Sequence, residues 1–417
     1  MLRNICVIAV LKVYSYLKYG SHLFINKWGS DSHKDKHSLH RTMKFKSISL
    51  AAAYFFLIMS GCTTQEKKNN TQPLIDYSQI PILSLEQEFT ISASDNYIPA
   101  FVMDIIVDDD GRILVSERQE KAVHQFDSTG TYVARVARSG RGPGELTRNA
   151  NAHSNGDVLV MSNNNGNLTE YRPNDEGVYS FVEDHTNQLP GPMRGIRSDG
   201  EFTSAYVAVD SVQIPFGVIP PEFTTDLIHI VRFDGDSLEV EENVLSIGRH
   251  SSYVEIVNDG QGMTYNTLPY RYSDSLTPLR GQQLMVTRPR ESAIQIYDED
   301  LDLVHDLELN VASRPVSDDD FDFHFSEFSG AELADRKALV RDIKPPFTWV
   351  IMDDERRFWL RTDHTKEGYE YVILSYDGEP IGRFYLTESK RLFSVKDDKM
   401  YLFDFEIAEI EVIAVKI

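Results

Sequence analysis

The sequence predicts an all-β protein: a six-bladed β-propeller of four-stranded antiparallel blades, closed by an N-terminal strand and carrying a short helical insertion. Three observations favour this fold. Beyond residue 80, alternating apolar runs of five to eight residues are separated by tight turns. A unit of four such runs recurs along the chain. The last unit has only three runs, whereas one additional run precedes the first unit.

The clearest unit spans residues 101–137 and reads FVMDIIVDDDGRILVSERQEKAVHQFDSTGTYVARVA. It divides into strand, Asp-Asp-Gly turn, strand, polar loop, strand, Ser-Thr-Gly turn and strand. Gly111 and Gly130 are expected to supply the positive φ that lets two strands fold back tightly. Residues 113–115 are apolar on both faces of the second strand, so this strand should be covered on both sides. The unit is therefore predicted to be an antiparallel meander of four strands.

Later units repeat this order of strands and turns. They lie at 150–184, 193–248, 276–311 and 347–386. The final unit, 391–417, has three strands, and Ile82–Ile91 could supply the fourth by pairing the two ends of the chain. A lone four-stranded sheet cannot bury both of its faces, and a closed ring also removes exposed sheet edges. The main alternative is a two-sheet sandwich, whose strands would not repeat in fours with the same turn chemistry.

Two longer segments interrupt the repeat. The first, Ser313–Pro346, contains Ala331–Arg341, whose apolar residues have helical spacing. This stretch predicts a short helix, ended by Pro345 and Pro346, because proline lacks an amide donor and biases the preceding residue away from helix. The second segment, Gly248–Ser275, contains Tyr253, Tyr265, Tyr270 and Tyr272.

Residues 43–61 have the order of a secretory signal peptide. Lys44 and Lys46 precede an apolar stretch too short to span a bilayer, and two small residues stand before Cys62. With the cysteine directly after this small pair, the segment resembles a bacterial lipoprotein signal. The resemblance implies that the Cys62 sulfur carries a lipid, that Cys62 becomes the first residue, and that the protein is anchored in the cell envelope, at the outer membrane. An ordinary signal peptide or membrane anchor is the alternative.

These features divide the chain into four parts. Residues 1–42 are interpreted as a mis-called upstream extension, because a signal peptide starts at its basic region. Residues 43–61 form the signal, and the polar, aperiodic residues 62–80 are expected to be a flexible tether. The propeller is expected to occupy residues 81–417 and, as a closed ring, to be a monomer.

A glycine-rich stretch after the first unit carries a family resemblance. Residues 139–146 read SGRGPGEL, and the turns DDDGRILV (108–115) and DDERRFWL (353–360) align with each other. Together they resemble the six-bladed propeller lipoproteins of Gram-negative gut and marine bacteria, which are related in shape to NHL-repeat and TolB-like propellers. The resemblance implies a fold and a location rather than a chemistry. Glu145 can reach back to backbone amides or to Arg141, which favours a blade-to-blade connector; the alternative is a loop at the central mouth.

Composition excludes several kinds of function. The formal net charge of -22 argues against nucleic acid as a partner, because affinity for phosphate backbones comes mainly from Lys and Arg. No cysteine follows Cys62, and neither a His-Glu-x-x-His nor a Gly-x-Ser-x-Gly motif occurs. The acidic triplets 108–110 and 318–320 lack the ligand spacing of a calcium loop and are interpreted as turn or solvated residues. We therefore expect no catalytic residue, no metal ligand and no cofactor other than the lipid on Cys62.

The candidate ligand site is the central mouth, where loops between second and third strands share one face with the connectors between blades. Arginine forks there would suit carboxylates. The candidate residues are Arg118, Arg141, Glu145, Asn164, Arg288, Arg290 and His364. In the alternative interpretation, these arginines pair with neighbouring Asp and Glu.

Two functions follow from this site. The first is a non-catalytic binding or scaffold module, tethered to the envelope, that recognises a peptide, a glycan or a partner protein at the mouth. The second is a metal-dependent lyase or lactonase of the propeller type, which would need several Glu, Asp, Asn or His side chains converging from different blades. Binding is the preferred hypothesis.

Overall fold

The computed structural model describes residues 73–146, 150–163, 168–185, 189–198, 202–209, 223–234, 237–250, 253–257, 262–266 and 268–417. The predicted upstream extension, the signal peptide, Cys62 and most of the tether lie outside these residues, as does Asn164.

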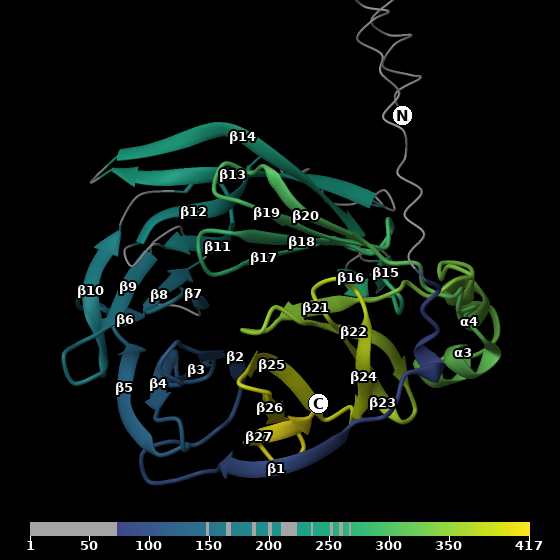
Figure 1. Ribbon diagram of the computed structural model, residues 1–417, viewed down its shortest axis with the longest axis horizontal. Coiled ribbons are helices and arrows are strands. Elements are labelled where there is room, and N and C mark those ends of the chain that lie inside the picture. The colour runs from purple at the N-terminus through teal and green to yellow at the C-terminus, as the bar shows by residue number, and fades with distance from the viewer. Residues whose placement is uncertain are drawn as a thin grey trace, which may run out of the picture. The chain divides into compact units, whose positions relative to one another are not determined.

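Six sheets of antiparallel strands stand around a ring, which confirms the predicted six-bladed propeller (Figure 1). Within each blade the strands follow one another in the sheet, and the first strand lies nearest the centre. Blade 1 consists of β2 (Val102–Val107), β3 (Ile113–Glu117), β4 (Ala122–Phe126) and β5 (Tyr132–Ser139); blade 2 of β7 (Ala150–Asn155), β8 (Val158–Asn163), β9 (Leu168–Pro173) and β10 (Tyr179–His185); blade 3 of β11 (Met193–Ser198), β12 (Phe202–Val209), β13 (Phe223–Asp234) and β14 (Ser237–His250).

The second half of the ring contains the closure. Blade 4 consists of β17 (Ser275–Pro278), β18 (Leu284–Arg288), β19 (Ala293–Tyr297) and β20 (Leu303–Glu308); blade 5 of β21 (Trp349–Met352), β22 (Phe358–Thr365), β23 (Gly368–Leu374) and β24 (Pro380–Leu386); blade 6 of β25 (Lys390–Lys396), β26 (Lys399–Asp404), β27 (Glu409–Lys416) and β1 (Ser84–Ile91). β1 pairs antiparallel with β27, from Ser84 opposite Lys416 to Ile91 opposite Ile410. The predicted pairing of the two chain ends is therefore confirmed.

The middle strands of the blades are covered on both faces. Every residue of β3 and β4 is buried, as the apolar residues on both faces of β3 predict. Gly111 and Gly130 have φ of 79° and 83°, as expected for the two hairpin turns of blade 1. The core consists of apolar layers between neighbouring blades; one of them joins Ile105 of blade 1 to Phe403 of blade 6.

The two aligned acidic turns share one hydrogen-bonding pattern. In blade 5, Asp353 accepts hydrogen bonds from the backbone amide of Arg357 at 2.8 Å and from its Nε at 2.7 Å. In blade 1, Asp108 accepts the same two bonds from Arg112. The repeated Asp and Arg therefore fix the turn between the first and second strands. This placement agrees with the structural interpretation of the first acidic triplet.

These first turns meet near the axis, on a face that we call the turn face. Lys396 of blade 6 donates a hydrogen bond of 2.6 Å to the backbone oxygen of Asp108. Arg280 of blade 4 forms an ion pair with Asp109 of blade 1, which lies across the ring. A pocket of about 360 Å³ lies beside them, bounded by blades 1, 4, 5 and 6. The opposite face contains the connectors between blades, and we call it the mouth face.

The folded body begins before residue 81, where the sequence interpretation placed its start. Ile75, Tyr77 and Ile80 are buried in the core between blades 4 and 5. The short 3-10 helix η1 (Tyr77–Gln79) lies in this segment, and the Arg314 guanidinium lies 5.0 Å from the Tyr77 ring centroid. Residues 73–80 are thus a docked strap rather than part of a flexible tether, because their apolar side chains have a core to enter.

The insertions are more ordered than expected. The predicted helix 331–341 is α4 (Gly330–Lys337), which ends well before Pro345. The acidic triplet begins an additional helix, α3 (Asp318–His324), where Asp320 forms a capping box with Ser317. The other insertion contains a hairpin of β15 (Tyr253–Val257) and β16 (Gly262–Asn266). None of the helices in the described ranges has the length and apolar character needed to cross a bilayer.

Candidate functional site

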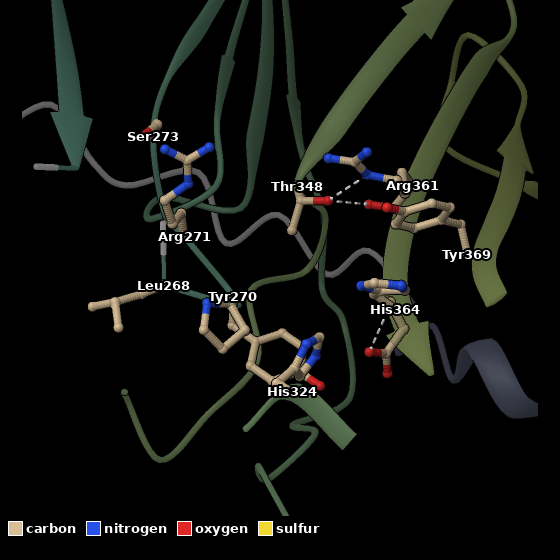
Figure 2. A pocket seen from close by; sticks show the side chains of 11 residues that line it. Leu268, Tyr270, Arg271, Ser273, His324, Thr348, Arg361, His364 and Tyr369 are labelled. Atoms are coloured by element: carbon tan, nitrogen blue, oxygen red, sulfur yellow. Dashed lines mark hydrogen bonds between the residues drawn. The ribbon is translucent and has the colours of Figure 1, made fainter. Parts of the chain in front are cut away.

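A pocket of about 220 Å³ opens on the mouth face, between the two insertions and blade 5 (Figure 2). We call it the mouth pocket. Its lining residues are Leu268, Pro269, Tyr270, Arg271, Ser273, His324, Thr348, Arg361, Asp363, His364 and Tyr369. Only His364 among these belongs to the predicted ligand-binding set.

Arg361 is the main cationic group of this pocket. It extends from β22, and its Nε donates a hydrogen bond of 3.0 Å to the Thr348 hydroxyl, which orients the guanidinium. The same guanidinium carbon lies 5.2 Å from the ring centroid of Tyr369. Within the described ranges Arg361 makes no ion pair. Arg271 lies on the opposite wall, so two guanidinium groups flank the pocket (Figure 2).

Two histidines form another part of the lining. The rings of His324 and His364 have centroids 5.2 Å apart, and the His364 ring stacks on Tyr369 at 4.2 Å. Burial, together with the nearby His364, lowers the pKa of His324 to about 4, and burial also lowers the pKa of His364. His364 Nε2 lies 3.2 Å from Glu388 Oε1, although the geometry is not that of a hydrogen bond. At neutral pH both rings are therefore uncharged, and the positive charge of the pocket comes from arginine.

The acidic group in the lining, Asp363, already has cationic partners, Lys344 and Arg314. Asp363 accepts a hydrogen bond of 2.8 Å from Lys344 Nζ, which also donates to Asp320 at 2.7 Å. Asp320 accepts a further bond of 2.8 Å from the Tyr270 hydroxyl. Burial opposes ionisation of Asp320, but the bonds from Lys344 and from the Ser317 amide outweigh it and lower the pKa to about 2. This buried network fixes one wall of the pocket without cancelling the charge of Arg361.

A second pocket, of about 250 Å³, adjoins the first on blades 5 and 6. The two share Arg361 and Tyr369. Four aromatic rings line the second pocket, those of Trp349, Tyr369, Tyr371 and Phe405. A ligand anchored at Arg361 could therefore extend into either pocket.

The other predicted site residues lie elsewhere on the mouth face. Arg288 donates to Asp274 at 2.9 Å and to Gln295 at 2.7 Å, so it has the neighbouring carboxylate that the alternative interpretation expected. The Arg118 guanidinium lies over the Phe101 ring at 5.3 Å. Arg290 is exposed beyond the end of β18. None of these three side chains lines either mouth-face pocket.

Glu145 forms the connector that the sequence suggested. Its Oε2 accepts hydrogen bonds of 2.8 Å from the backbone amides of Arg141 and Gly142, and its Oε1 accepts one of 2.9 Å from Arg138. Glu145 also begins the short strand β6 (Glu145–Leu146), which pairs parallel with β5. The side chain of Arg141 is exposed. Glu145 therefore fixes the conformation of the connector 138–145 through its own hydrogen bonds.

Replacing Gly144 by alanine should destabilise this connector. Gly144 has φ of +70°, and an added Cβ would lie 2.8 Å from the Phe181 side chain. Left-handed backbone costs an L-residue about 1–2 kcal/mol, and the steric contact adds to it. We expect Gly144→Ala to lower the free energy of unfolding by about 2 kcal/mol or more in urea titrations. Gly142→Ala is the control, because its added Cβ would meet only the movable Glu145 carboxylate at 3.3 Å; an equal loss for both variants would contradict this account.

Arg361, Thr348, Tyr369 and His324 were not predicted from the sequence. Tyr270 was noted only as one of the aromatic residues in its insertion. Arg361 follows three apolar residues in the second strand of the fifth unit, where a single arginine is a weak signal. In the parts of the chain with assigned positions, no three His, Cys, Asp or Glu side chains form a group that could hold a metal ion.

Comparison with known proteins shows little beyond architecture. No family model matches the chain, and no curated protein matches its sequence. A Bacteroides fragilis protein described as exported is 12% identical with a TM-score of 0.43, covering 82% of this chain and 97% of its own. A member of the DUF4221 family from Bacteroides vulgatus is 11% identical with a TM-score of 0.42, covering 81% and 99%. Virginiamycin B lyase from Staphylococcus aureus is 9% identical with a TM-score of 0.34, covering 80% and 99%. The assignment of the propeller therefore rests on the strand pairing of this chain itself.

Proposed function

We propose that this protein is a non-catalytic binding module of the cell envelope that recognises a peptide, a glycan or a protein partner through a carboxylate held in the mouth pocket. The observation that carries this proposal is Arg361. It is an oriented arginine in a pocket, and it makes no ion pair with any residue that the structure describes.

The geometry of Arg361 suits a carboxylate. Its Nε donates to Thr348, and the guanidinium also lies within hydrogen-bonding reach of the Tyr371 hydroxyl. Both partners are neutral, so they leave the charge of Arg361 for a ligand. A planar guanidinium binds a carboxylate through two parallel hydrogen bonds, and such charge-assisted bonds are stronger than neutral ones. Asp363 does not compete, because Lys344 already donates to it. The neutral imidazoles and the aromatic rings nearby could contact the uncharged remainder of the ligand.

The anchoring is proposed on the order of residues 43–62. A basic start, a short apolar stretch and small residues before Cys62 support lipid attachment at the Cys62 sulfur and a location at the outer membrane. The SGRGPGEL stretch and the paired Asp–Arg turns support membership of the NHL-like or TolB-like propeller lipoproteins.

Binding of defined carboxylates tests the site. The probes are trigalacturonate with its methyl ester, and a pentapeptide with a free C-terminus together with its C-terminal amide, each titrated calorimetrically into residues 73–417. Hydrogen bonds to charged groups contribute roughly 1.5–3 kcal/mol. We therefore expect one free acid to bind at least about tenfold more tightly than its neutral form, and Arg361→Gln to remove that difference.

Arg356→Gln is the matched control, because Arg356 is an exposed arginine of the turn face that donates to Tyr376. It should bind the probe as the unaltered protein does. Equal binding of acid and neutral forms, binding that survives Arg361→Gln, or failure of every probe to bind would each count against a carboxylate site.

A further inference from the structure

The turn face of the propeller is strongly acidic. It contains the turns between first and second strands and those between third and fourth strands. Exposed carboxylates occur in such turns in blades 1, 2, 4, 5 and 6. They include Asp109, Asp157, Glu176, Asp300, Asp354 and Asp397.

The mouth face also has exposed carboxylates, among them Asp318, Asp322, Glu332, Glu388 and Glu406, but it differs from the turn face in its apolar side chains. Six large apolar side chains in its loops are exposed by 42–61%: Ile98, Phe101, Leu339, Ile343, Phe405 and Ile407. In the described ranges, no hairpin turn of the turn face carries an exposed side chain of this kind. The remaining exposed large apolar residues lie on strands, in the segment 74–82 or at the chain end. Exposed apolar groups gathered on one face indicate an interaction surface.

The chain also enters the propeller at the mouth face. Ile75 forms a parallel bridge with Val311, in the connector that follows β20. Ten residues, 63–72, separate Cys62 from Pro73. Even when fully extended, ten residues span only about 35 Å. A lipid on Cys62 would therefore hold the mouth face closer to the bilayer than the turn face.

We propose that the mouth face is turned towards the bilayer that holds the lipid of Cys62, with its apolar loop side chains touching the headgroup region and the acidic turn face directed away. This inference rests on the proposed lipid attachment. The entry point of the chain and the apolar loops are separate features, and both favour the same orientation. Apolar side chains gain free energy by entering the interfacial region of a bilayer.

The orientation has a consequence for the site. The mouth pocket lies on the same face as the apolar loops and thus opens towards the membrane surface. Its ligand would reach it from that surface rather than from the far side of the ring, where Arg280 and Asp109 bridge the axis.

Quenching by membrane lipids tests the orientation. The lipid-carrying protein, with a single added cysteine at Ile407→Cys or Asp300→Cys, is labelled with bimane and placed in phosphatidylcholine–phosphatidylglycerol vesicles that contain a spin-labelled lipid. Both positions are exposed, one on each face. We expect at least about twofold stronger quenching at Ile407 than at Asp300, and Ile98→Glu with Phe101→Glu should reduce that difference.

The outcomes separate the parts of the proposal. Mass spectrometry of the purified protein shows whether Cys62 carries a lipid; a chain without lipid would overturn both the anchor and the orientation. Equal quenching at the two labels, or stronger quenching at Asp300, in a lipid-carrying chain would overturn the orientation alone. Neither result affects carboxylate binding by Arg361, which is measured without the membrane.

Discussion

A chain that begins at Ser92 is expected to lose the stable ring, whereas one that begins at Leu83 should keep it. The difference between them is β1 (Ser84–Ile91), which supplies the fourth strand of blade 6. Ile91 is buried and Phe89 packs against the layer between blades 6 and 1, while Leu85 packs between blades 5 and 6. Burying each large apolar side chain contributes about 1.5–3 kcal/mol, and the whole free energy of unfolding is about 5–15 kcal/mol. Loss of β1 also leaves β27 as an exposed edge open to aggregation.

Thermal unfolding followed by circular dichroism, with size-exclusion chromatography, measures this loss. The chain that begins at Leu83 is the control. It lacks residues 73–82, including the buried Ile75, Tyr77 and Ile80, but keeps β1, so the difference between the two chains measures β1. Adding a peptide of residues 83–92 to the shorter chain should recover part of the transition temperature. If the chain that begins at Ser92 unfolds at the same temperature as the control and remains monomeric, closure does not depend on β1.

Local patterns were sufficient to predict the ring. The short final unit and the extra run before the first unit together specified the pairing of β1 with β27. Turn residues repeat in each unit because the same hairpin needs the same backbone geometry. The strap was not predicted, because the contacts that bury it are not local in the sequence. Tyr77 is buried in the core between blades 4 and 5, beside Arg314, more than two hundred residues away. A polar aperiodic segment shows no sign of such contacts.

The candidate site was harder to predict. The strand order predicts which loops share the mouth face, but many arginines lie in these loops, and the sequence does not show which of them has a neighbouring carboxylate. Arg288 contacts Asp274, which comes from the connector before its blade, whereas Arg361 contacts a threonine. That distinction depends on how two insertions fold over blade 5, and the ordered helix α3 and the hairpin β15–β16 lay beyond local sequence patterns.

Asp353→Ala should cause the largest loss of stability among single substitutions outside the apolar core. The carboxylate is fully buried and accepts from Trp359 Nε1 at 2.7 Å as well as from Arg357. Alanine would leave the buried indole N–H without a partner and would remove one carboxylate from a buried guanidinium. Breaking such a buried pair costs about 3–5 kcal/mol. Because Arg357 keeps Asp398 at 2.6 Å, we expect a loss near the lower figure, about 3 kcal/mol, in equilibrium urea unfolding.

Asp354→Ala distinguishes this network from a general effect of removing charge at the turn. Asp354 is the next residue, is exposed, and accepts a bond of 3.2 Å from the Asp397 amide. Its loss should cost less than about 1 kcal/mol. Asp108→Ala in blade 1 should resemble Asp353→Ala, because Asp108 accepts from Arg112 in the same way and from the Tyr179 hydroxyl at 3.1 Å. If Asp353→Ala and Asp354→Ala lowered the free energy of unfolding by equally small amounts, the repeated Asp–Arg pair would not be a source of the turn's stability.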